Sequence, residues 1–533
     1  MTTGNVATHL REASQNLPNE KAIASSNPKG FPDRSFLELY RDVKACASRL
    51  QDKGIGKGDK TLLFVRPGYE LIVYAFSLFF LGAVPVIIDP GMGMKSILSC
   101  IRTTRPSHLV GIPVAHWMSR VFRKSFESVQ SRIKVETGIG SFSSFSDEKL
   151  LPVESHSEEL AAIVFTSGST GPPKGVCYKH KTFNGQINLL REHFGMAQGE
   201  VDMTTLPIFA LFNPALGITT VMPEINPSRP AKASARSLVQ TLLDYKITTA
   251  FASPIIGRKI AEWCKSRKID LPHVKRFFLA GAPSPPQLID DLASVVKEGE
   301  ILVPYGSTEA LPVSYCNHET IKQTREETEE GLGSCLGKPL DGISVKLFPI
   351  SSSPFGKEVE ELKDGRVGEI CVAGPIVTEE YHRMPGATLD SKFSYSSSLY
   401  HRMGDLGYFD GNKNLRFLGR KAERITTLQG VLETERVEPI VNAIDGVRRS
   451  ALIGIGNRAP VQACIVVESR KDSQNPEAKE RIRAKILEKL RSALPKFVIG
   501  LIIFEKSLPV DARHNAKIHR LHLSKKWTRK LIR

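Results

Sequence analysis

The stretch "AAIVFTSGSTGPPKG", residues 161–175, joins an uncharged apolar run to a loop rich in glycine and hydroxyl side chains. The apolar run predicts a buried strand, and residues 166–175 then supply four hydroxyls, three glycines, two prolines and Lys174. Glycines let backbone N–H groups approach a ligand closely, while hydroxyls and a lysine can donate hydrogen bonds to anionic oxygens. The loop therefore indicates a phosphate site. It is not a Walker loop, because Lys174 follows Pro173 and is not followed by Ser or Thr.

Apolar runs of the same kind recur between residue 30 and about residue 320, where they alternate with helical stretches. Strands that alternate with helices predict βαβ units and mainly parallel sheets, so the expected fold class is α/β. Ligands of open α/β sheets bind at the carboxyl ends of strands, where several of these runs enter loops rich in Gly, Ser, Thr or Pro. The further runs are "TLLFV" (61–65), "VPVIID" (84–89), "HLVGI" (108–112), "TAFAS" (249–253), "RFFLAG" (276–281) and "ILVPYGS" (301–307).

Residues 71–88, "LIVYAFSLFFLGAVPVII", carry no charge over about the minimum length that can span a bilayer. Gly82 and Pro85 interrupt the run, and an Asp-Pro-Gly sequence follows it at once. We therefore predict a buried helix to about Leu81, a short turn and a buried strand from Val84 to Ile88, with a membrane span as the alternative.

The alternation of apolar strands with helical stretches changes twice in the second half of the chain. Between about 330 and 418 the apolar runs are shorter, which predicts a smaller β subdomain. A small α+β domain is expected after Gly419, with a helix capped by Asn475 and Pro476. We thus predict an N-terminal domain over residues 1–419 and a C-terminal domain over residues 420–533. The apolar face of the predicted helix consists of Ile482, Ile486, Leu490 and Leu494.

Composition indicates a soluble globular protein, since 41% of the 533 residues are apolar and 24% are charged. The net charge of +17 suggests nucleic-acid binding, but the basic excess is mostly dispersed, and no nucleic acid is expected as a partner. The compact basic run is "KKWTRKLIR", residues 525–533, which we interpret as a solvated tail; contact with an anionic membrane, RNA or a partner is the alternative. Eight cysteines without regular spacing, and no apolar signal segment at the N-terminus, predict a cytoplasmic location.

Four further stretches bear on the phosphate site, although each is weak alone. They are "GAPSPP" (281–286), "PYGSTEA" (304–310), "HRMGDLGYFD" (401–410) and "PVDARHNAKIHR" (509–520). Taken singly, a Gly-Asp pair is typical of a turn, the glutamate of "STE" is typical of a helix cap, and a lysine beside isoleucine is typical of a solvated helix.

In this order, however, the stretches resemble the acyl-adenylate-forming superfamily, which includes acyl-CoA synthetases, luciferases and peptide-synthetase adenylation domains. Residues 165–176 resemble its phosphate loop, residues 305–310 its magnesium and adenine motif, and residues 367–385 its β-subdomain motif. Residues 403–420 match its ribose motif and residues 515–520 its C-terminal lysine motif. The resemblance covers nearly the whole chain. It implies a large domain of parallel-rich sheets with a β subdomain, followed by a small, mobile α+β lid.

The resemblance assigns ATP binding to residues in four of these motifs. Thr166 to Gly171 are expected to wrap the β and γ phosphates, Tyr305 to stack on adenine, and Asp405 to accept both ribose hydroxyls. The complete predicted set is Thr166, Ser167, Gly168, Ser169, Thr170, Gly171, Lys174, Gly281, Ala282, Pro283, Tyr305, Gly306, Ser307, Thr308, Asp405 and Arg420.

In the adenylation reaction that the resemblance implies, a carboxylate attacks the α-phosphate of ATP and pyrophosphate leaves. Negative charge must therefore be stabilised on both the attacking and the leaving side of this in-line displacement. The resemblance gives the catalytic roles to Lys517, Glu309 and Arg420. Glu309 is expected to bind Mg²⁺, a hard cation that prefers carboxylate, water and phosphate oxygens. Lys517 is expected to bridge the attacking carboxylate and the ribose. The expected cofactors are therefore ATP and Mg²⁺.

Adenylation is the first half-reaction of this superfamily, and the transfer of the activated acyl group is the second. Three departures from the superfamily concern this second half-reaction. Ala210 stands where fatty-acid members commonly have His, Ala422 replaces the usual Asp or Lys of the hinge, and Ala516 replaces the Gly before the catalytic lysine. These departures put domain rotation to a thiol-accepting state in doubt. They resemble the β-lactone synthetases of bacterial olefin biosynthesis, as do the longer stretches at residues 66–91 and 209–231.

That branch adenylates a 2-alkyl-3-hydroxy fatty acid, and the acid's own 3-hydroxyl then displaces AMP to close a β-lactone. CoA is a substrate only under the alternative, a long-chain acyl-CoA ligase; a catalytically inactive binding scaffold is a third interpretation. Phe209 and Phe212 are expected either to line the acyl pocket or to belong to the core. No residue identifies itself as the base, and His514 is only a candidate. Expected partners are the long-chain acyl substrate and, left open, other lipid-pathway enzymes.

Overall fold

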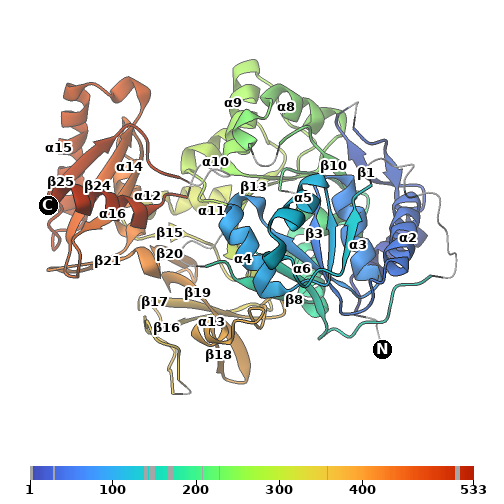
Figure 1. Cartoon of the computed structure of the whole chain (residues 1–533). Coiled ribbons are helices and arrows are strands. Elements are labelled where there is room, and N and C mark those ends of the chain that lie inside the picture. The colour runs from blue at the N-terminus through green and yellow to red at the C-terminus, as the bar shows by residue number, and fades with distance from the viewer. Residues whose placement is uncertain are drawn as a thin grey trace.

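Two parallel-rich sheets with helices between and around them make up the first part of the molecule (Figure 1). The computed structural model describes residues 4–27, 30–136, 142, 150–165, 172–206, 208–226, 229–356, 358–510 and 517–532. The predicted α/β class is confirmed, and every apolar run quoted above as a strand overlaps one for most of its length.

The eight-stranded sheet is parallel except at its two ends, where β14 and β2 run antiparallel to their neighbours. Its order is β14 (Ala310–Asn317), β13 (Glu300–Ser307), β12 (Arg276–Leu279), β11 (Thr249–Ala252), β9 (Val201–Thr204), β10 (Thr219–Met222), β1 (Lys21–Ser25) and β2 (Arg34–Ser35). The six-stranded sheet ends in an antiparallel pair, β7 and β8. Its order is β6 (Ser131–Lys134), β5 (His108–Gly111), β3 (Lys60–Phe64), β4 (Val84–Ile88), β7 (Leu160–Phe165) and β8 (Gly175–Lys179).

Helices cover these sheets and bury their apolar faces. They are α1 (Ala7–Asn16), α2 (Phe36–Asp52), α3 (Tyr69–Phe80), α4 (Met94–Thr104), α5 (Pro113–Val121), α6 (His180–Phe194), α7 (Asn213–Leu216), α8 (Ala235–Asp244), α9 (Pro254–Arg267), α10 (Pro286–Ala293), α11 (His318–Gln323) and α12 (Arg325–Glu329).

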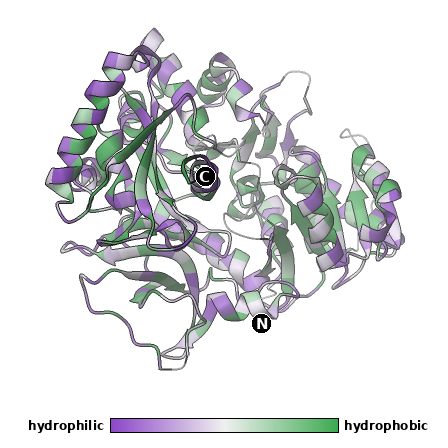
Figure 2. Ribbon diagram, turned by 60° about the vertical axis from the view of Figure 1, so that its left-hand side comes forward, coloured by the Kyte–Doolittle hydropathy of each residue, from purple (hydrophilic) through white to green (hydrophobic). Residues whose placement is uncertain are grey.

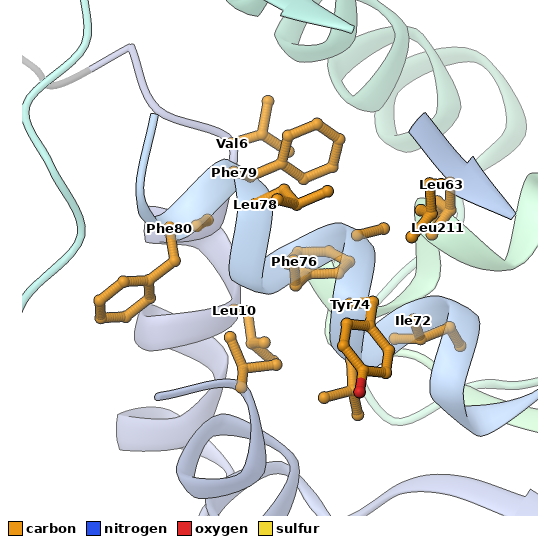
Figure 3. Packing of buried hydrophobic residues seen from close by; sticks show 14 of the residues in the cluster. Val6, Leu10, Leu63, Ile72, Tyr74, Phe76, Leu78, Phe79, Phe80 and Leu211 are labelled. Atoms are coloured by element: carbon orange, nitrogen blue, oxygen red, sulfur yellow. The ribbon is translucent and has the colours of Figure 1, made fainter. Parts of the chain in front are cut away.

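The uncharged run at residues 71–88 forms the predicted helix and strand, because α3 ends at Phe80 and β4 begins at Val84. Figure 3 shows why α3 is apolar on all sides: Phe76 and Phe79 pack among side chains from α1, β3 and the 209–211 turn. The membrane-span alternative receives no support, since none of the helices found in the described residues combines the length and apolarity needed to cross a bilayer.

A separate antiparallel sheet forms the predicted β subdomain, shown in yellow to orange in Figure 1. Its order is β15 (Ser334–Cys335), β20 (Leu415–Arg420), β19 (Ser398–Phe409), β17 (Gly368–Ala373) and β16 (Ser344–Phe348), with β18 (Lys392–Tyr395) paired to β19 and α13 (Pro385–Ser391) preceding β18. The long strand β19 and its neighbour β20 carry Asp405 and Arg420.

The chain after β20 forms an α+β lobe with its own sheet and core, at the left of Figure 1. It contains η6 (Lys421–Glu423), β21 (Ile425–Thr427), β22 (Gly430–Leu432), α14 (Glu438–Asn442), β23 (Val447–Ile455), β24 (Gln462–Ser469), α15 (Pro476–Ala493), β25 (Leu501–Glu505) and α16 (Arg520–Leu531). Asn475 caps α15 as predicted, since its side chain accepts from the Ala478 N–H at 2.7 Å. The hydropathy colours of Figure 2 place the apolar residues mainly on the inner strands.

Residues 525–533 do not form a tail, because most of this run belongs to α16, although Lys525, Arg529 and Lys530 are solvent-exposed as expected. Leu523 is buried, and the Trp527 Nε1–H donates to Glu505 Oε1 at 3.0 Å. Lys526 pairs with the same carboxylate. The basic run is therefore docked on its own lobe through its apolar side.

Candidate active site

The ends of β12 and β13 bring two of the predicted segments together. These strands are parallel neighbours, with Phe278 opposite Leu302. The carboxyl end of β12 leads into Gly281–Pro283, and the carboxyl end of β13 contains Tyr305–Ser307, so both segments lie at the same end of the parallel strands. Gly281 has a φ of +89°, a left-handed conformation that glycine adopts without strain.

Glu309 lies in a tight hairpin, not at a helix cap. Thr308 and Glu309 are the two residues between β13 and β14, and the Thr308 carbonyl accepts from the Tyr178 hydroxyl at 2.6 Å. Gly306 has no room for a side chain, since a Cβ there would lie 2.6 Å from the Ala310 carbonyl oxygen. The hairpin therefore fixes the backbone that carries Glu309.

Asp405 and Tyr305 meet although 100 residues separate them. The Tyr305 hydroxyl donates to Asp405 Oδ2 at 2.7 Å. Arg420 stands directly opposite Asp405 in the β19–β20 register, and its Nη1 lies 3.1 Å from Asp405 Oδ1. The predicted adenine and ribose residues thus form one connected cluster.

The environment of Asp405 leaves one of its oxygens available. Asp405 is only 2% exposed, and its buried Oδ1 accepts no hydrogen bond from the described residues, because the approach of Arg420 is close but poorly directed. Burial raises the pKa of Asp405, while the charge of Arg420, the Tyr305 hydroxyl and the charge of Lys517 oppose that rise. A buried acceptor without a donor fits a ligand hydroxyl such as that of a ribose.

Glu309 is held as a carboxylate by the groups around it. The Tyr381 hydroxyl donates to Glu309 Oε1 at 2.6 Å. Burial alone raises the pKa of Glu309, but His401, Tyr381 and Lys392 outweigh it and bring the pKa to about 2. His401 is itself uncharged at neutral pH, since burial and the charge of Lys392 lower its pKa to about 3. Near pH 7 the Tyr381 hydroxyl therefore stabilises the carboxylate, and Lys392 adds to this only in its protonated form.

Lys392 reaches this cluster from β18, where it stands opposite His401 of β19. Its Nζ donates to the Thr378 carbonyl, and the Thr378 N–H donates to the Glu309 carbonyl at 2.9 Å. Burial lowers the pKa of Lys392 to about 7, although the charge of Glu309 acts in the opposite direction. The β subdomain thus places a buried amine beside the hairpin of the large sheet.

Lys174 joins the same cluster from the start of β8. Its Nζ lies 4.7 Å from the centre of the Tyr381 ring. Backbone hydrogen bonds connect the two segments: the His382 N–H donates to the Gly175 carbonyl at 2.8 Å, and the Cys177 N–H donates to the Glu380 carbonyl at 3.2 Å. The predicted phosphate-binding residues Thr166–Gly171 lie outside the described residues, so their placement stays a prediction.

Lys517 lies three residues before α16, next to Ile518, which forms a backbone bridge with Val510. Its charge is one of the influences that lower the pKa of Asp405, so the two side chains lie within electrostatic range of each other. His514 and Ala516 lie outside the described residues.

Phe209 and Phe212 are both half-buried and pack against the core. Phe209 stacks on Phe251 with a centroid distance of 5.0 Å, and Phe251 stacks on Phe278 at 4.2 Å. Ala210 between them is fully buried. The two phenylalanines thus have core contacts, and a role in an acyl pocket stays a prediction.

Sequence reasoning did not select Tyr381, Lys392 or His401. Tyr381 and His401 lie inside stretches that were recognised as motifs, so their positions could have been found there. Lys392 stands in a stretch without any motif, and only the β18–β19 pairing reveals it.

The residues present fit ATP and Mg²⁺. Asp405 offers a buried acceptor, Lys174 and Lys517 supply positive charge, and Glu309 supplies an ionised oxygen ligand. No group of three or more His, Cys, Asp or Glu side chains able to hold a metal occurs in the described part of the chain. A single carboxylate is sufficient for Mg²⁺ bound mainly through phosphates and water.

Comparison with known proteins shows what the chain as a whole is similar to. The sequence profile described as "AMP-binding enzyme" matches residues 10–382. The chain is 37% identical to an olefin β-lactone synthetase of Stenotrophomonas maltophilia, over 98% of this chain and 97% of that protein. It is 36% identical to the olefin β-lactone synthetase of Xanthomonas campestris, with the same coverage. The fold superposes on ATP-bound MatB from Rhodopseudomonas palustris with a TM-score of 0.81 and 20% identity, covering 99% of each chain.

Proposed function

The chain belongs to the AMP-binding enzyme family, and from that premise we propose that it converts a long-chain 2-alkyl-3-hydroxy carboxylic acid into a β-lactone. The protein is an AMP-forming, acid-activating ligase. The finer activity rests on one observation, the identity of 37% and 36% to two olefin β-lactone synthetases over almost the entire chain.

The described residues suit the first half-reaction. ATP, with Mg²⁺, supplies the phosphorus that the substrate carboxylate attacks. Asp405 and Tyr305 orient the nucleoside end, and Glu309 holds an oxygen ligand toward the phosphates with Tyr381 behind it. Lys174 and Lys517 offset the negative charge that develops on the two sides of the displacement.

We assign residues 1–419 to an adenylation domain and residues 420–533 to a lid that carries Lys517. The C-terminal residues have their own core, which suits this division. We also place the protein in the cytoplasm, where ATP is available.

The second half-reaction uses the substrate's own 3-hydroxyl. Its oxygen attacks the acyl carbon of the adenylate, the bond from that carbon to the AMP oxygen breaks, and the hydroxyl proton is lost to a base. Adenylation is needed because a free carboxylate is a poor electrophile and the four-membered ring is strained. An internal nucleophile has a high effective concentration, so no diffusing thiol acceptor is required.

Product analysis tests the proposal. The purified protein receives ATP, Mg²⁺ and a 2-alkyl-3-hydroxy fatty acid, with and without CoA, and the products are identified by NMR and mass spectrometry. We expect AMP, pyrophosphate and a β-lactone in both reactions. The matched substrate without the 3-hydroxyl should support ATP–pyrophosphate exchange and give no lactone. Acyl-CoA formed only when CoA is present, with no lactone from the hydroxy acid, would overturn the proposal in favour of an acyl-CoA ligase.

A further inference from the structure

Helix α5 exposes large apolar side chains that its own packing does not require. Val114, Trp117 and Val121 are 48%, 57% and 52% exposed. Their spacing of three and four residues puts them on one side of the helix. The opposite side already anchors α5, because Ala115 and Met118 are buried in the core that also receives α4. The exposed stripe therefore plays no part in holding the fold together.

The chain on either side of this stripe is rich in exposed basic side chains, three of which, Arg120, Arg123 and Lys124, lie on α5 or directly after it. Residues 91–134, which run from the turn before α4 to the end of β6, contain eight Lys or Arg residues and one acidic residue, Glu127. Glu127 lies 4.0 Å from Arg105 and so offsets only one of these charges. The expectation that the basic excess is dispersed along the chain is wrong for this segment. The exposed basic residues here are Lys95, Arg102, Arg105, Arg120, Arg123, Lys124, Arg132 and Lys134.

We propose that the solvent-facing side of α5 and its basic surroundings, the α5 surface, dock on an anionic lipid bilayer. Tryptophan prefers the boundary between lipid and water, and lysine and arginine are attracted to anionic headgroups. Apolar side chains that enter the headgroup region beside such a basic rim are typical of helices that lie on a membrane.

Two alternatives to a bilayer docked on the α5 surface are less well supported: a nucleic acid on the same surface, and membrane contact through the C-terminal run. A nucleic acid would use the basic residues and could stack a base on Trp117, but Val114 and Val121 would gain nothing from phosphates or bases. Contact through the C-terminal run is disfavoured because Trp527 and Lys526 of α16 are engaged with Glu505. A bilayer uses both the charge and all three apolar side chains of α5. It is also a natural reservoir for a long-chain acid, although the docking does not depend on the proposed function.

Vesicle binding tests the α5 surface without reference to catalysis. The full-length protein is sedimented with vesicles of phosphatidylglycerol and phosphatidylcholine in equal parts, and with vesicles of phosphatidylcholine alone, at low and high salt. We expect binding to the anionic vesicles only, weakened by salt, with a blue shift of tryptophan fluorescence that is lost in Trp117→Phe.

Two triple variants separate the apolar and charged contributions. The apolar variant is Val114→Ser, Trp117→Ser and Val121→Ser, and the charge variant is Arg120→Glu, Arg123→Glu and Lys124→Glu. Each should weaken partition into anionic vesicles by about tenfold or more. The matched control has the same charge change on the exposed side of α15: Lys485→Glu, Lys489→Glu and Arg491→Glu. A second control tests α16 with Lys525→Glu, Arg529→Glu and Lys530→Glu.

Each result decides the proposal. Loss of binding in both α5 variants, with near wild-type binding in the two controls and unchanged thermal unfolding, supports it. Failure of the wild-type protein to bind anionic vesicles overturns it, as does full binding by the charge variant or loss of binding in the α16 control alone. Binding of the wild-type protein to RNA but not to vesicles overturns it in favour of a nucleic-acid surface.

Discussion

Replacing Tyr381 by Phe isolates the contribution of one hydroxyl to Glu309, the proposed Mg²⁺ ligand. The change removes the donor to Glu309 Oε1 at 2.6 Å and retains the ring beside Lys174. A hydrogen bond to a charged group contributes about 1.5–3 kcal/mol, which corresponds to about one to two pKa units. The pKa of Glu309, about 2 in the wild type, therefore rises but stays far below 7, and the carboxylate remains ionised.

What the variant loses is the orientation of the carboxylate. Partners that orient a metal ligand typically contribute about 10–100-fold to metal affinity. We therefore expect the Mg²⁺ concentration for half-maximal ATP–pyrophosphate exchange to rise about tenfold or more, while the rate at saturating Mg²⁺ stays near that of the wild type.

The control for this experiment is Tyr400→Phe. Tyr400 exchanges a hydrogen bond of 2.8 Å with Ser344 within the β subdomain, and its loss should leave the Mg²⁺ requirement unchanged. Equal Mg²⁺ dependence in Tyr381→Phe and the wild type, when Glu309→Gln is impaired, would refute the role assigned to the hydroxyl.

Three further predictions use the same exchange assay. Lys517→Ala should lower adenylation by about a hundredfold or more with normal folding, because a charge that acts mainly in the transition state is lost; a wild-type rate would contradict its catalytic role. Glu309→Gln should raise the Mg²⁺ requirement, and unchanged metal dependence would exclude Glu309 as a ligand. Gly306→Ala should reduce exchange and destabilise the fold by about 1–3 kcal/mol in thermal unfolding, since its Cβ would lie 2.6 Å from the Ala310 carbonyl oxygen. Gly386→Ala is its control, because a Cβ there meets nothing within 4 Å and the unfolding temperature should not fall.

The strands were predictable because their burial is nearly complete. In β4, β7 and β11 most side chains are apolar on both faces, so the runs stand out in the sequence without alternation. The break between α3 and β4 was equally visible, since Gly82 takes a left-handed φ of +65° that the helix could not continue through.

The structure brings several of the predicted site residues together, but their contacts could not be predicted from the sequence. Local sequence around Glu309 is compatible with a helix cap, and only the pairing of β13 with β14 makes it a hairpin. The approach of Tyr381 to Glu309 depends on how the β subdomain packs on the large sheets. That of Lys392 to His401 depends on the pairing of β18 with β19. The basic C-terminal run was misjudged for a similar reason, because its apolar positions acquire a partner only when β23 and β25 are in place.

The backbone hydrogen bonds between β8 and residues 380–382 have a thermodynamic consequence. Gly175 is bonded to His382, and the intervening neighbour Tyr381 is bonded to Glu309. Under the proposed function, a nucleotide that shifts Gly175 also shifts the Tyr381 hydroxyl at Glu309, the proposed Mg²⁺ ligand. The proposal therefore predicts that nucleotide and Mg²⁺ binding are coupled, and such coupling is reciprocal: whatever factor the nucleotide adds to the affinity for Mg²⁺, Mg²⁺ adds to the affinity for the nucleotide.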